Sequence, residues 1–503
     1  MSDFIEINTD DIKSPQVGND LFENRATVAA MHRENTPEVT IIVQAYNRLE
    51  KTKRCVDSIL KYTANIDYEL LLIDNGSTDG TTEYFLSVPY EKKRVIHITK
   101  NLEASYPNTV LSLNDFAQFV AQVNNDLIVT EHWLDNLLTC IKSDPKIGMV
   151  NPVSSNASNL QGVELSYKSY EEMQEQASRF NRSDPRKWED RLRLITLGTV
   201  YRKEVLLCLG WPLWDSGFFH DFGDDDVTFA VRRAGYRTVL AGDTWICHDH
   251  DYSRGENKNL AEYQRSLEIG RQNFRDKYFG IDSWEDVNNY LLPYLEYFPT
   301  PKKKELTHVL GVDVRCGTPL LDIKNMLRKA NVFHVELSAF TQEPKYWTDL
   351  KTICKGTVAC DREEFLEDWF VAEKFDYVMI DRPINCYHEP QKLLQTVFAL
   401  CKKGGCVILK LKNTGTFREY VNLLGQRQVY DPAFAYNMPI EAVHTALRAF
   451  GHVLHTIAIP FHMSREQQDA LSELLPSECS IEQRDEIMGR MLCNEYLLMI
   501  EKK

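Results

Sequence analysis

Short apolar segments alternate with amphipathic ones through most of the chain. The segment "VTIIV" starts at Val39 and "ELLLID" ends at Asp74, with a helical pattern over Glu50 to Tyr62 between them. Apolar strands separated by helices predict an α/β fold with a parallel sheet covered by helices. Ligands of such sheets bind beyond the carboxyl ends of the strands, so functional residues are expected directly after each strand.

The same pattern predicts two α/β domains in the 503 residues. Residues 1–37 are polar and acidic and predict an N-terminal extension, followed by a first domain over 38–255. A helical linker is expected over 256–300, where "YFPTPKKKEL" brings prolines and lysines. A second series of strands, from "THVLGVDV" to "NEYLLMIEKK", predicts a second domain over 301–503.

Charge and composition narrow the function. The net charge of -15 argues against a nucleic-acid-binding surface, which needs clustered Lys and Arg. No apolar run reaches the roughly 18 residues of a membrane span, and "MSDFIEINTD" lacks the order of a signal peptide, so a cytoplasmic location is expected. Several of the twelve cysteines lie in apolar segments without a C-x-x-C pair, which predicts free thiols.

Two strand ends carry the first candidate binding residues. Ala45, Tyr46 and Asn47 follow the first strand, at the edge where a ligand would meet the sheet. Asp74 ends the second strand, and "GSTDG" after it has the composition of a turn. Alone, either segment could be a surface turn.

Together these segments resemble glycosyltransferase family 2, which has the GT-A fold, a Rossmann-like mixed sheet with a nucleotide-binding half. The family ends its first strand in a P-x-Y-N-type segment and its second in a D-x-x-S-x-D-G-type segment. The resemblance implies that Ala45, Tyr46 and Asp74, with Asn47 beside them, hold the base and ribose of a nucleotide sugar. The sequence departs from the family at Gln44, where proline is usual.

The segment "VNNDLIVTEHW" lies where the family carries its metal-binding D-x-D motif, often written N-N-D. The resemblance implies that Asp126 ligates Mn²⁺ or Mg²⁺, with Asn124 and Asn125 nearby. A nucleotide diphosphate leaves readily only when its developing charge is neutralised, and a cation held by one or two carboxylates does this. The alternative is that these residues merely end a strand.

Three adjacent acids, Asp224, Asp225 and Asp226, precede the helical pattern "VTFAVRRAGY". Asp224 or Asp225 would be an acceptable helix N-cap. The family's E-D-type motif falls on this segment, and its acid is the general base of an inverting transfer. An ungapped match on "AGYR" places the base at Asp224, whereas a match on the acid pair places it at Asp225. A carboxylate beside two others should have a raised pKa.

Two further segments complete the predicted first site. In "TWICHDHDYS", His248 and His250 stand where the family carries a histidine that binds metal or diphosphate, although a lone histidine is more often structural. In "ITLGTVYRKEV", Gly198 and Thr199 resemble the strand that faces the donor sugar and the acceptor cleft.

The second domain resembles the class I S-adenosylmethionine-dependent methyltransferase fold in the order of its motifs, with "NEYLLMIEKK" as its last strand. The family's first loop reads E-x-G-C-G-x-G, but "DVRCGTP" keeps only Gly317 and has Arg315 and Pro319 at two glycine positions. Arg315 adds a side chain and Pro319 removes an N–H donor. Glu336 is predicted to end the second strand, where the family binds ribose.

These features predict a metal-dependent inverting glycosyltransferase that uses a nucleotide-diphosphate sugar, with UDP as the expected nucleotide. The acceptor would be a protein, such as a bacterial flagellin, or a glycan. The second domain is expected to be degenerate and used for packing, homo-oligomerisation or acceptor docking. The alternatives are a bifunctional enzyme that also methylates, using S-adenosylmethionine, and a non-catalytic glycan- or protein-binding scaffold.

Overall fold

The computed structural model describes residues 4–9, 37–102, 116–209, 215, 218, 222–249, 260–299, 306–419, 438–461, 463–473, 475 and 478–503. The chain divides into two compact units, Met1–Asn288 and Asn289–Lys503. All twelve cysteines are free thiols, as predicted. Within the described part of the chain, no helix combines the length and the apolar character that crossing a membrane requires.

The first unit alternates strands and helices, as the hydrophobic pattern predicts. Its strands are β1 Phe4–Ile7, β2 Val39–Ala45, β3 Tyr68–Asp74, β4 Lys93–Ile98, β5 Phe119–Asn124, β6 Leu127–Ile128, β7 Ile147–Ser154, β8 Trp188–Asp190, β9 Thr199–Arg202 and β10 Arg237–His248. Its helices are α2 Leu49–Tyr62, α3 Thr81–Ser87, α5 Trp133–Lys142, α6 Tyr170–Phe180, η3 Pro185–Lys187, α7 Lys203–Leu209, α8 Gly223–Arg233 and α9 Leu260–Lys277.

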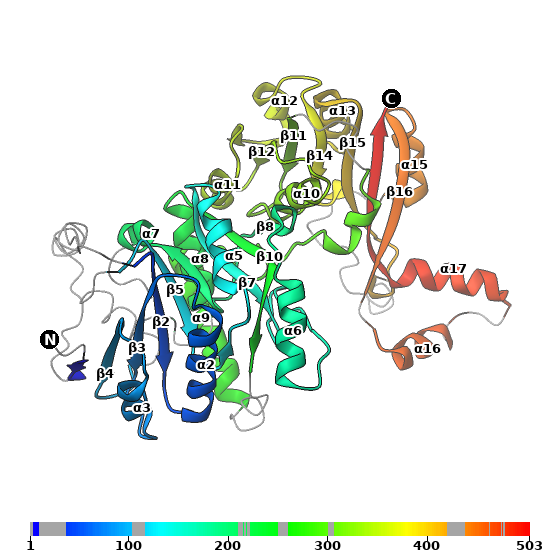
Figure 1. The fold of residues 1–503 in the computed structure, drawn as a ribbon. Helices are drawn as coiled ribbons and strands as arrows, with labels where there is room; N and C mark the ends of the chain where they lie inside the picture. Colours follow the sequence, from blue (N-terminus) through cyan, green and yellow to red (C-terminus); the bar gives the residue numbers. More distant parts are fainter. Residues whose placement is uncertain are drawn as a thin grey trace. The chain divides into compact units, whose positions relative to one another are not determined.

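These strands form one mixed sheet in the order β1-β4-β3-β2-β5-β9-β7-β10-β6, with β8 paired to β10 (Figure 1). Strands β1 to β5 run parallel, and β9 is antiparallel to both β5 and β7. Strand β10 is parallel to β7. The carboxyl ends of β2, β5, β7 and β10 and the amino end of β9 therefore lie along one edge of the sheet.

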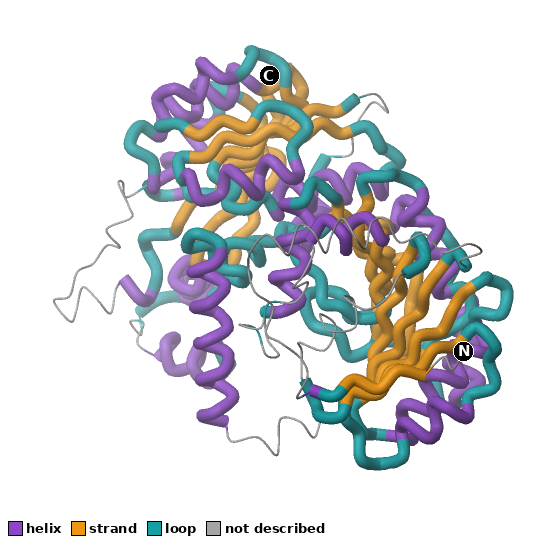
Figure 2. Tube along the Cα trace, turned by 90° about the vertical axis from the view of Figure 1, so that its left-hand side faces the viewer, coloured by secondary structure: helices purple, strands orange, loops and turns teal. Residues whose placement is uncertain are grey.

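Apolar side chains bury both faces of this sheet. Strand β3 is buried along its whole length, and alternate residues of the central strands belong to two separate hydrophobic clusters. Helices lie along the sheet in Figure 2. A strand with both faces covered carries a nearly continuous apolar run, which is why "ELLLI" shows no alternation.

Two segments differ from their predicted roles. Residues 4–7, expected in an extension, form β1 and pair in parallel with β4. Helix α9, expected in a linker, belongs to the first unit. The Phe274 ring packs against that of Phe229 with centroids 5.0 Å apart, which ties α9 to α8. Aromatic positions along α9 therefore serve the core of the first unit.

The second unit is a separate α/β structure. Its strands are β11 Thr307–Val312, β12 Val335–Thr341, β13 Val358–Cys360, β14 Phe375–Ile380, β15 Cys401–Lys412, β16 Gly451–Pro460 and β17 Cys493–Lys502. Its helices are η5 Leu292–Tyr297, α10 Thr318–Lys329, η6 Pro344–Tyr346, α11 Trp347–Ile353, η7 Glu363–Phe365, α12 Leu366–Trp369, η8 Ile384–Cys386, α13 Pro390–Leu400, α15 Ile440–Leu447, α16 Arg465–Glu473 and α17 Ile481–Leu492.

Its sheet has the order β13-β12-β11-β14-β15-β17-β16. Strands β11 to β15 are parallel, and β17 lies antiparallel between β15 and β16, whose long arrows are visible in Figure 1. The last strand of the chain thus enters the sheet, as predicted for "NEYLLMIEKK". A separate hydrophobic cluster forms the core of this unit.

Candidate active site

Candidate residues of the first unit gather where β2 and β5 end. Gln44 pairs with Asn124 across these two parallel strands, and Ala45 pairs with Asp74 of β3. The chain leaves β2 towards β3 on one side, whereas β5 lies on the other side. A sheet opens a crevice at such a point, because the connections diverge from it. Tyr46, which is 48% exposed, follows β2 at this point and is available to a ligand.

Asn47 joins the turns after β2, β3 and β5. Its side-chain oxygen accepts a hydrogen bond from Thr78 N at 2.9 Å, and its own N–H donates to Ser77 Oγ at 2.8 Å. Its carbonyl accepts a bond from the amide of Asn125 at 3.0 Å. Asn47 also has a φ of 55°, a left-handed conformation that Asn tolerates better than most residues. Asn47 therefore fixes the turns after β2, β3 and β5 and is not merely part of a surface turn.

The departure from the family at Gln44 has a structural explanation. Gln44 Nε2 donates to Asn124 Oδ1 at 2.9 Å, and Gln122 Nε2 donates to Gln44 Oε1 at 3.2 Å. Proline could not form these side-chain bonds between β2 and β5. Asn125 also donates to Thr52 Oγ1 at 2.9 Å. The amide side chains of Asn124 and Asn125 thus tie the end of β5 to β2 and to the start of α2, directly before the predicted metal ligand Asp126.

Asp126 lies between two cationic or potentially cationic side chains. His248 Nε2 is 3.8 Å from Asp126 Oδ1, and Arg48 Nη1 is 3.8 Å from Asp126 Oδ2. The antiparallel pairing of β6 with the end of β10 brings these residues together, because His248 is the partner of Leu127. Asp249 N also donates to Asp126 O at 2.9 Å. His250, the other predicted histidine, lies outside the described residues.

Asp126 and His248 are suitable ligands for a divalent cation whose remaining ligands come from the substrate. His248 Nδ1 lies 3.3 Å from the carbonyl of Asn156, which can only accept a hydrogen bond, so Nδ1 is the donor in this contact and Nε2 is the nitrogen that faces Asp126. Among the described residues, no group of three or more His, Cys, Asp or Glu side chains could hold a metal. Cations of Mg²⁺ type are commonly held by one or two carboxylates plus substrate phosphates, so this incomplete protein set fits the role.

Two predicted nucleotide contacts are placed differently. Asp74 is fully buried, its Oδ1 accepts from Ser77 N at 2.8 Å, and its Oδ2 bonds to the Thr82 hydroxyl. His97 Nδ1 lies 3.3 Å from the same Oδ2. A carboxylate enclosed in this way supports the turn after β3, and the expectation that Asp74, with Ala45 and Tyr46, holds the base and ribose of a nucleotide sugar stays a prediction. The signal was ambiguous because a buried anchor and a ligand contact both favour an acid at a strand end.

Gly198 and Thr199 are also buried rather than open to a ligand. A Cβ added to Gly198, whose φ is 62°, would lie 2.7 Å from Ile246 Cδ1. Thr199 is completely buried and pairs with Gln122 of β5. Gly198 therefore packs the sheet directly before β9, and Thr199 starts that strand. Their predicted place facing the donor sugar and the acceptor cleft stays a prediction.

The three adjacent acids lie in the first turn of α8, which begins at Gly223. The N-cap is Phe222, with a φ of 69° and no side-chain cap, so neither Asp224 nor Asp225 has the predicted capping position. Phe222 is fixed by stacking on Trp284 with ring centroids 5.0 Å apart. The acids still gain from the positive end of the helix dipole, but their side chains point to three different partners.

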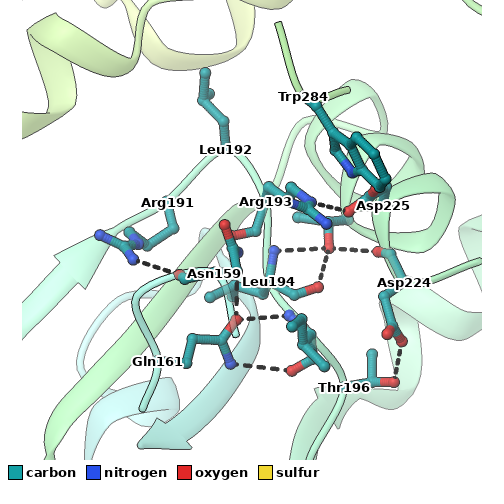
Figure 3. Close-up of polar contacts among 12 residues, drawn as sticks. Asn159, Gln161, Arg191, Leu192, Arg193, Leu194, Thr196, Asp224, Asp225 and Trp284 are labelled. Carbon is teal, nitrogen blue, oxygen red and sulfur yellow. Dashed lines mark hydrogen bonds and ion pairs between the residues drawn. The ribbon is translucent and has the colours of Figure 1, made fainter. Parts of the chain in front are cut away.

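Asp226 and Asp225 are both occupied by contacts within the unit. Asp226 Oδ1 accepts from the Tyr278 hydroxyl at 2.6 Å and lies 2.7 Å from Lys277 Nζ, so it joins α8 to the end of α9. The buried Asp225 forms an ion pair with Arg193 Nε (Figure 3). Asp226, a member of the acidic triplet predicted to be catalytic, thus links α8 to the end of α9 through these contacts.

Asp224 is the triplet member with the properties of a base. Its side chain is partly exposed, unlike those of its neighbours. Burial raises its pKa to about 6, although a hydrogen bond from Thr196 opposes this rise. The Thr196 hydroxyl donates to Asp224 Oδ1, as Figure 3 shows. A carboxylate whose pKa lies near neutrality can take a proton from a reacting group at neutral pH and later release it to water.

The two parts of the site share one edge of the sheet. Thr196 precedes β9, whose first residue Thr199 pairs with Gln122, two residues before the end of the antiparallel β5. Asp224 is bonded to Thr196, and Asp126 follows β5 directly. Asp224 and Asp126 therefore lie at the same edge although 97 residues separate them in the chain.

Sequence reasoning missed Arg48, Arg193 and Thr196. Arg48 could have been found, because cations at the start of a helix oppose the helix dipole and need another reason to be there. Arg193 and Thr196 carried no usable signal. Their partners Asp225 and Asp224 are separated from them by 32 and 28 residues.

In the second unit, side chains contact one another at the sheet edge where the cofactor was predicted to bind. Asp313 accepts two bonds from Gln342, from N at 2.8 Å and from Nε2 at 2.9 Å, which join the ends of β11 and β12. Asp381, after β14, is paired with Lys410 at 2.5 Å and lies 3.9 Å from Arg315 Nε. These contacts occupy the strand ends at which a nucleoside would lie.

The predicted ribose ligand of this unit was misplaced. Glu336 is the second residue of β12, at its amino end, and pairs with His308 and Lys374. The strand runs on to Thr341, so Gln342 stands where the acid was expected. The error came from reading "HVELS" as a complete strand. With Arg315 and Pro319 in the first loop, the residues present do not fit S-adenosylmethionine.

Comparison with known proteins agrees with this geometry. Residues 40–206 match the model of glycosyl transferase family 2, so this part of the chain is a domain of that family. The glycosyltransferase AglE of Haloferax volcanii is 26% identical over 219 residues, 42% of this chain and 67% of AglE. The chain spans only 28% and 36% of the length of the first curated relatives that it matches. The family match and the mixed sheet confirm the predicted GT-A fold.

Two solved structures are similar to parts of the chain. The chain is similar to the mannosyltransferase PcManGT from Pyrobaculum calidifontis in complex with GDP-Man and Mn²⁺, with a TM-score of 0.32 and 18% identity over 46% of this chain and 64% of that one. It is also similar to a SAM-dependent methyltransferase from Archaeoglobus fulgidus, with a TM-score of 0.31 and 16% identity over 46% of this chain and 98% of that one. The sheet order of the second unit, with antiparallel β17, agrees with the predicted methyltransferase-like fold.

Proposed function

We propose that this chain is a metal-dependent inverting glycosyltransferase that transfers a sugar from a nucleotide diphosphate to a hydroxyl group. The family 2 domain supports glycosyl transfer as the class of reaction. The observation that carries the proposal is the shared sheet edge, where His248 Nε2 lies 3.8 Å from Asp126 Oδ1 and where Asp224 has a near-neutral pKa. Such a transfer needs a site for the leaving group and a base for the acceptor.

Tyr46, exposed at the end of β2, is the proposed platform for the nucleotide base. Asn47 and Asn125 keep the turns around it in place. When bound, Mn²⁺ or Mg²⁺ at Asp126 and His248 neutralises the charge that develops on the departing diphosphate. Arg48 adds a fixed positive charge beside the same carboxylate.

Asp224 is the proposed general base. It takes the proton from the acceptor hydroxyl while that oxygen attacks the anomeric carbon on the face opposite the diphosphate, and the configuration inverts. A carboxylate whose pKa is about 6 is mostly ionised at pH 7 and is a stronger base than an ordinary Asp. Of the two residues that the sequence offers as the base, we favour Asp224, because Asp225 forms an ion pair with Arg193.

UDP remains the proposed nucleotide, and a protein, such as a flagellin, or a glycan the proposed acceptor. Turnover identifies the donor: the full chain is incubated with UDP- and GDP-sugars, with and without Mn²⁺, and release of the nucleoside diphosphate is followed. Hydrolysis to water can be measured before an acceptor is known. We expect turnover with one donor class, and its loss on chelation of the metal.

Two variants test the assigned roles. Asp126→Ala should remove metal-dependent donor binding, whereas Asp224→Asn should lower turnover by about 10²- to 10⁴-fold and leave donor affinity nearly unchanged. Donor affinity is measured by calorimetry with Mn²⁺ present. Full metal-dependent turnover in Asp126→Ala would refute the metal site, and a loss of donor affinity in Asp224→Asn would refute its role as the base.

The second unit is proposed to have no methyl-transfer activity, since its strand ends are bridged by Asp313–Gln342 and Asp381–Lys410 contacts. Packing, self-association or acceptor docking is its proposed use. The bifunctional alternative predicts binding of S-adenosylmethionine, and the non-catalytic scaffold predicts no turnover with any nucleotide sugar.

A further inference from the structure

We propose that Thr196 is a positioning residue that fixes the orientation of the Asp224 carboxylate, and that the segment Arg191–Thr196 is a rigid support for it. This inference rests on the proposed function. The segment precedes β9 and is held from two sides, by the loop after β7 and by helix α8. Figure 3 shows Thr196 and Asp224 pointing towards each other, with Gln161 and Asn159 on the opposite side of the segment.

The loop side holds the segment by its backbone. Gln161, which is fully buried, accepts a bond from Ile195 N at 2.6 Å and donates to Ile195 O at 3.1 Å. Asn151, also fully buried, donates to the same carbonyl at 2.5 Å. Asn159 Nδ2 donates to Arg193 O at 2.8 Å. Both backbone polar groups of Ile195, the residue before Thr196, are therefore held by buried amides.

Helix α8 holds the same segment from the other side. Arg232 Nε donates to Leu192 O at 3.1 Å. The Thr228 hydroxyl lies 3.3 Å from Leu194 N and 3.2 Å from Leu194 O. It also lies 2.7 Å from Asp224 O, so one side chain joins the segment to the first turn of the helix. These bonds favour one position of the segment, because displacing it would leave buried donors and acceptors unpaired.

This support determines which oxygen of Asp224 takes the proton. The Thr196 hydroxyl donates to Oδ1, so proton transfer from an acceptor falls to Oδ2. A hydrogen bond to the charged carboxylate favours ionisation and offsets part of the rise that burial causes in the pKa of Asp224. Among the charged groups that face Asp224, Asp225 raises its pKa and Arg193 lowers it.

The pH profile of kcat distinguishes this role from a merely structural one. A base acts in its ionised form, so kcat falls as the pH drops through the pKa of Asp224. Thr196→Val removes the hydroxyl donor, and we expect the acidic limb to move up by about one pH unit, because one unit corresponds to the strength of a single hydrogen bond. Thr196→Ser keeps a hydroxyl and should restore the limb of the wild-type protein.

Thr228→Val is the matched control, because it removes a threonine hydroxyl that bonds to main-chain atoms of Leu194 and Asp224 and not to the Asp224 carboxylate. It should lower stability without moving the limb. If Thr196→Val does not fold, judged by circular dichroism, Thr196→Ala gives the same comparison. A wild-type protein inert with every donor refutes the proposed function, and this inference with it. An active wild-type protein whose limb is unchanged by the loss of the Thr196 hydroxyl refutes this inference alone.

Discussion

Three adjacent carboxylates have three different environments in this protein. Asp225 is buried against Arg193, Asp226 is bound to Tyr278 and Lys277, and Asp224 is partly exposed beside Thr196. The first turn of a helix spreads successive side chains by about 100° each, so neighbours in sequence cannot share one partner. The repulsion expected within the triplet is thereby relieved, since two of the charges are compensated by cations from other segments.

Asp224→Asn should stabilise the folded protein above pH 6. The pKa of Asp224 is raised from 3.8 to about 6, so the folded state holds a proton that the unfolded state loses as the pH rises between these values. Ionisation therefore costs the folded state about 3 kcal/mol at most, in full above pH 6 and not at all below pH 4. Urea unfolding of both proteins at pH 4 and pH 8 measures the difference.

The matched control for this prediction is Asp226→Asn. It removes the partner of Lys277 and weakens the bond to the buried Tyr278 hydroxyl, two contacts that Asp224→Asn leaves intact. Burial raises the pKa of Asp226 as well, so we expect Asp226→Asn to gain less stability at pH 8 than Asp224→Asn does. An equal gain in both variants would contradict a stabilising role for the contacts of Asp226.

The sequence could place these acids at a helix start but could not separate them. The apolar residues of "VTFAVRRAGY" define the helix, and the positive end of its dipole accounts for acids in its first turn. What separates them is their contacts with Arg193, Thr196 and Lys277, which are distant in the chain. No local pattern encodes those contacts.

At the scale of elements, function depends on how strands end. β2, β3 and β5 are adjacent and parallel, so the turns after them meet, and Asn47 bonds to the turns after β3 and β5. The hydrophobic pattern predicted these strands and the helix after β2. The support given by Asn47 required a left-handed backbone conformation that the sequence does not show.

Substitutions of Asn47 should separate its backbone role from its side-chain role. Asn47→Gly keeps the positive φ of 55° without strain and loses only the bond to Thr78. Asn47→Ala loses the same bond and adds a left-handed conformational cost of about 1 kcal/mol. We expect the Ala variant to be the less stable of the two by that amount, measured by chemical denaturation.

Donor affinity gives a second comparison between these variants. Both should bind the nucleotide sugar more weakly than the wild-type protein does, because both lose one of the two bonds that join residue 47 to the turn after β3. Equal stability of the Gly and Ala variants would contradict a strained left-handed conformation at this position.

At the scale of the whole molecule, the chain has two units with separate cores, and we expect them to differ in the ligands that they bind. The first contains the family 2 domain, and the second has bridged strand ends at the edge where a methyltransferase binds its cofactor. Chains with two such cores commonly unfold in more than one step.

A calorimetric scan of the full chain should therefore show two transitions. A nucleotide sugar that the protein turns over, added with Mn²⁺, should raise the temperature of one transition. At a concentration of 100 Kd, such a ligand stabilises the folded state that binds it by about 2.7 kcal/mol through mass action. S-adenosylmethionine should raise neither. A shift of the other transition by S-adenosylmethionine would restore the bifunctional alternative and overturn our interpretation of Arg315, Gln342 and Asp381.

The sequence by itself determined the α/β alternation, the presence of two such structures and the candidate acids, because burial of apolar surface sets a period that each element carries locally. Tertiary structure alone decided which acids are usable. Asp74 is a buried anchor, Asp226 links two helices and Asp224 is the partly exposed candidate base, since burial and partner charges depend on residues far away in the chain. A carboxylate acquires its pKa and its access to a ligand from its surroundings, and only the folded chain brings those surroundings together.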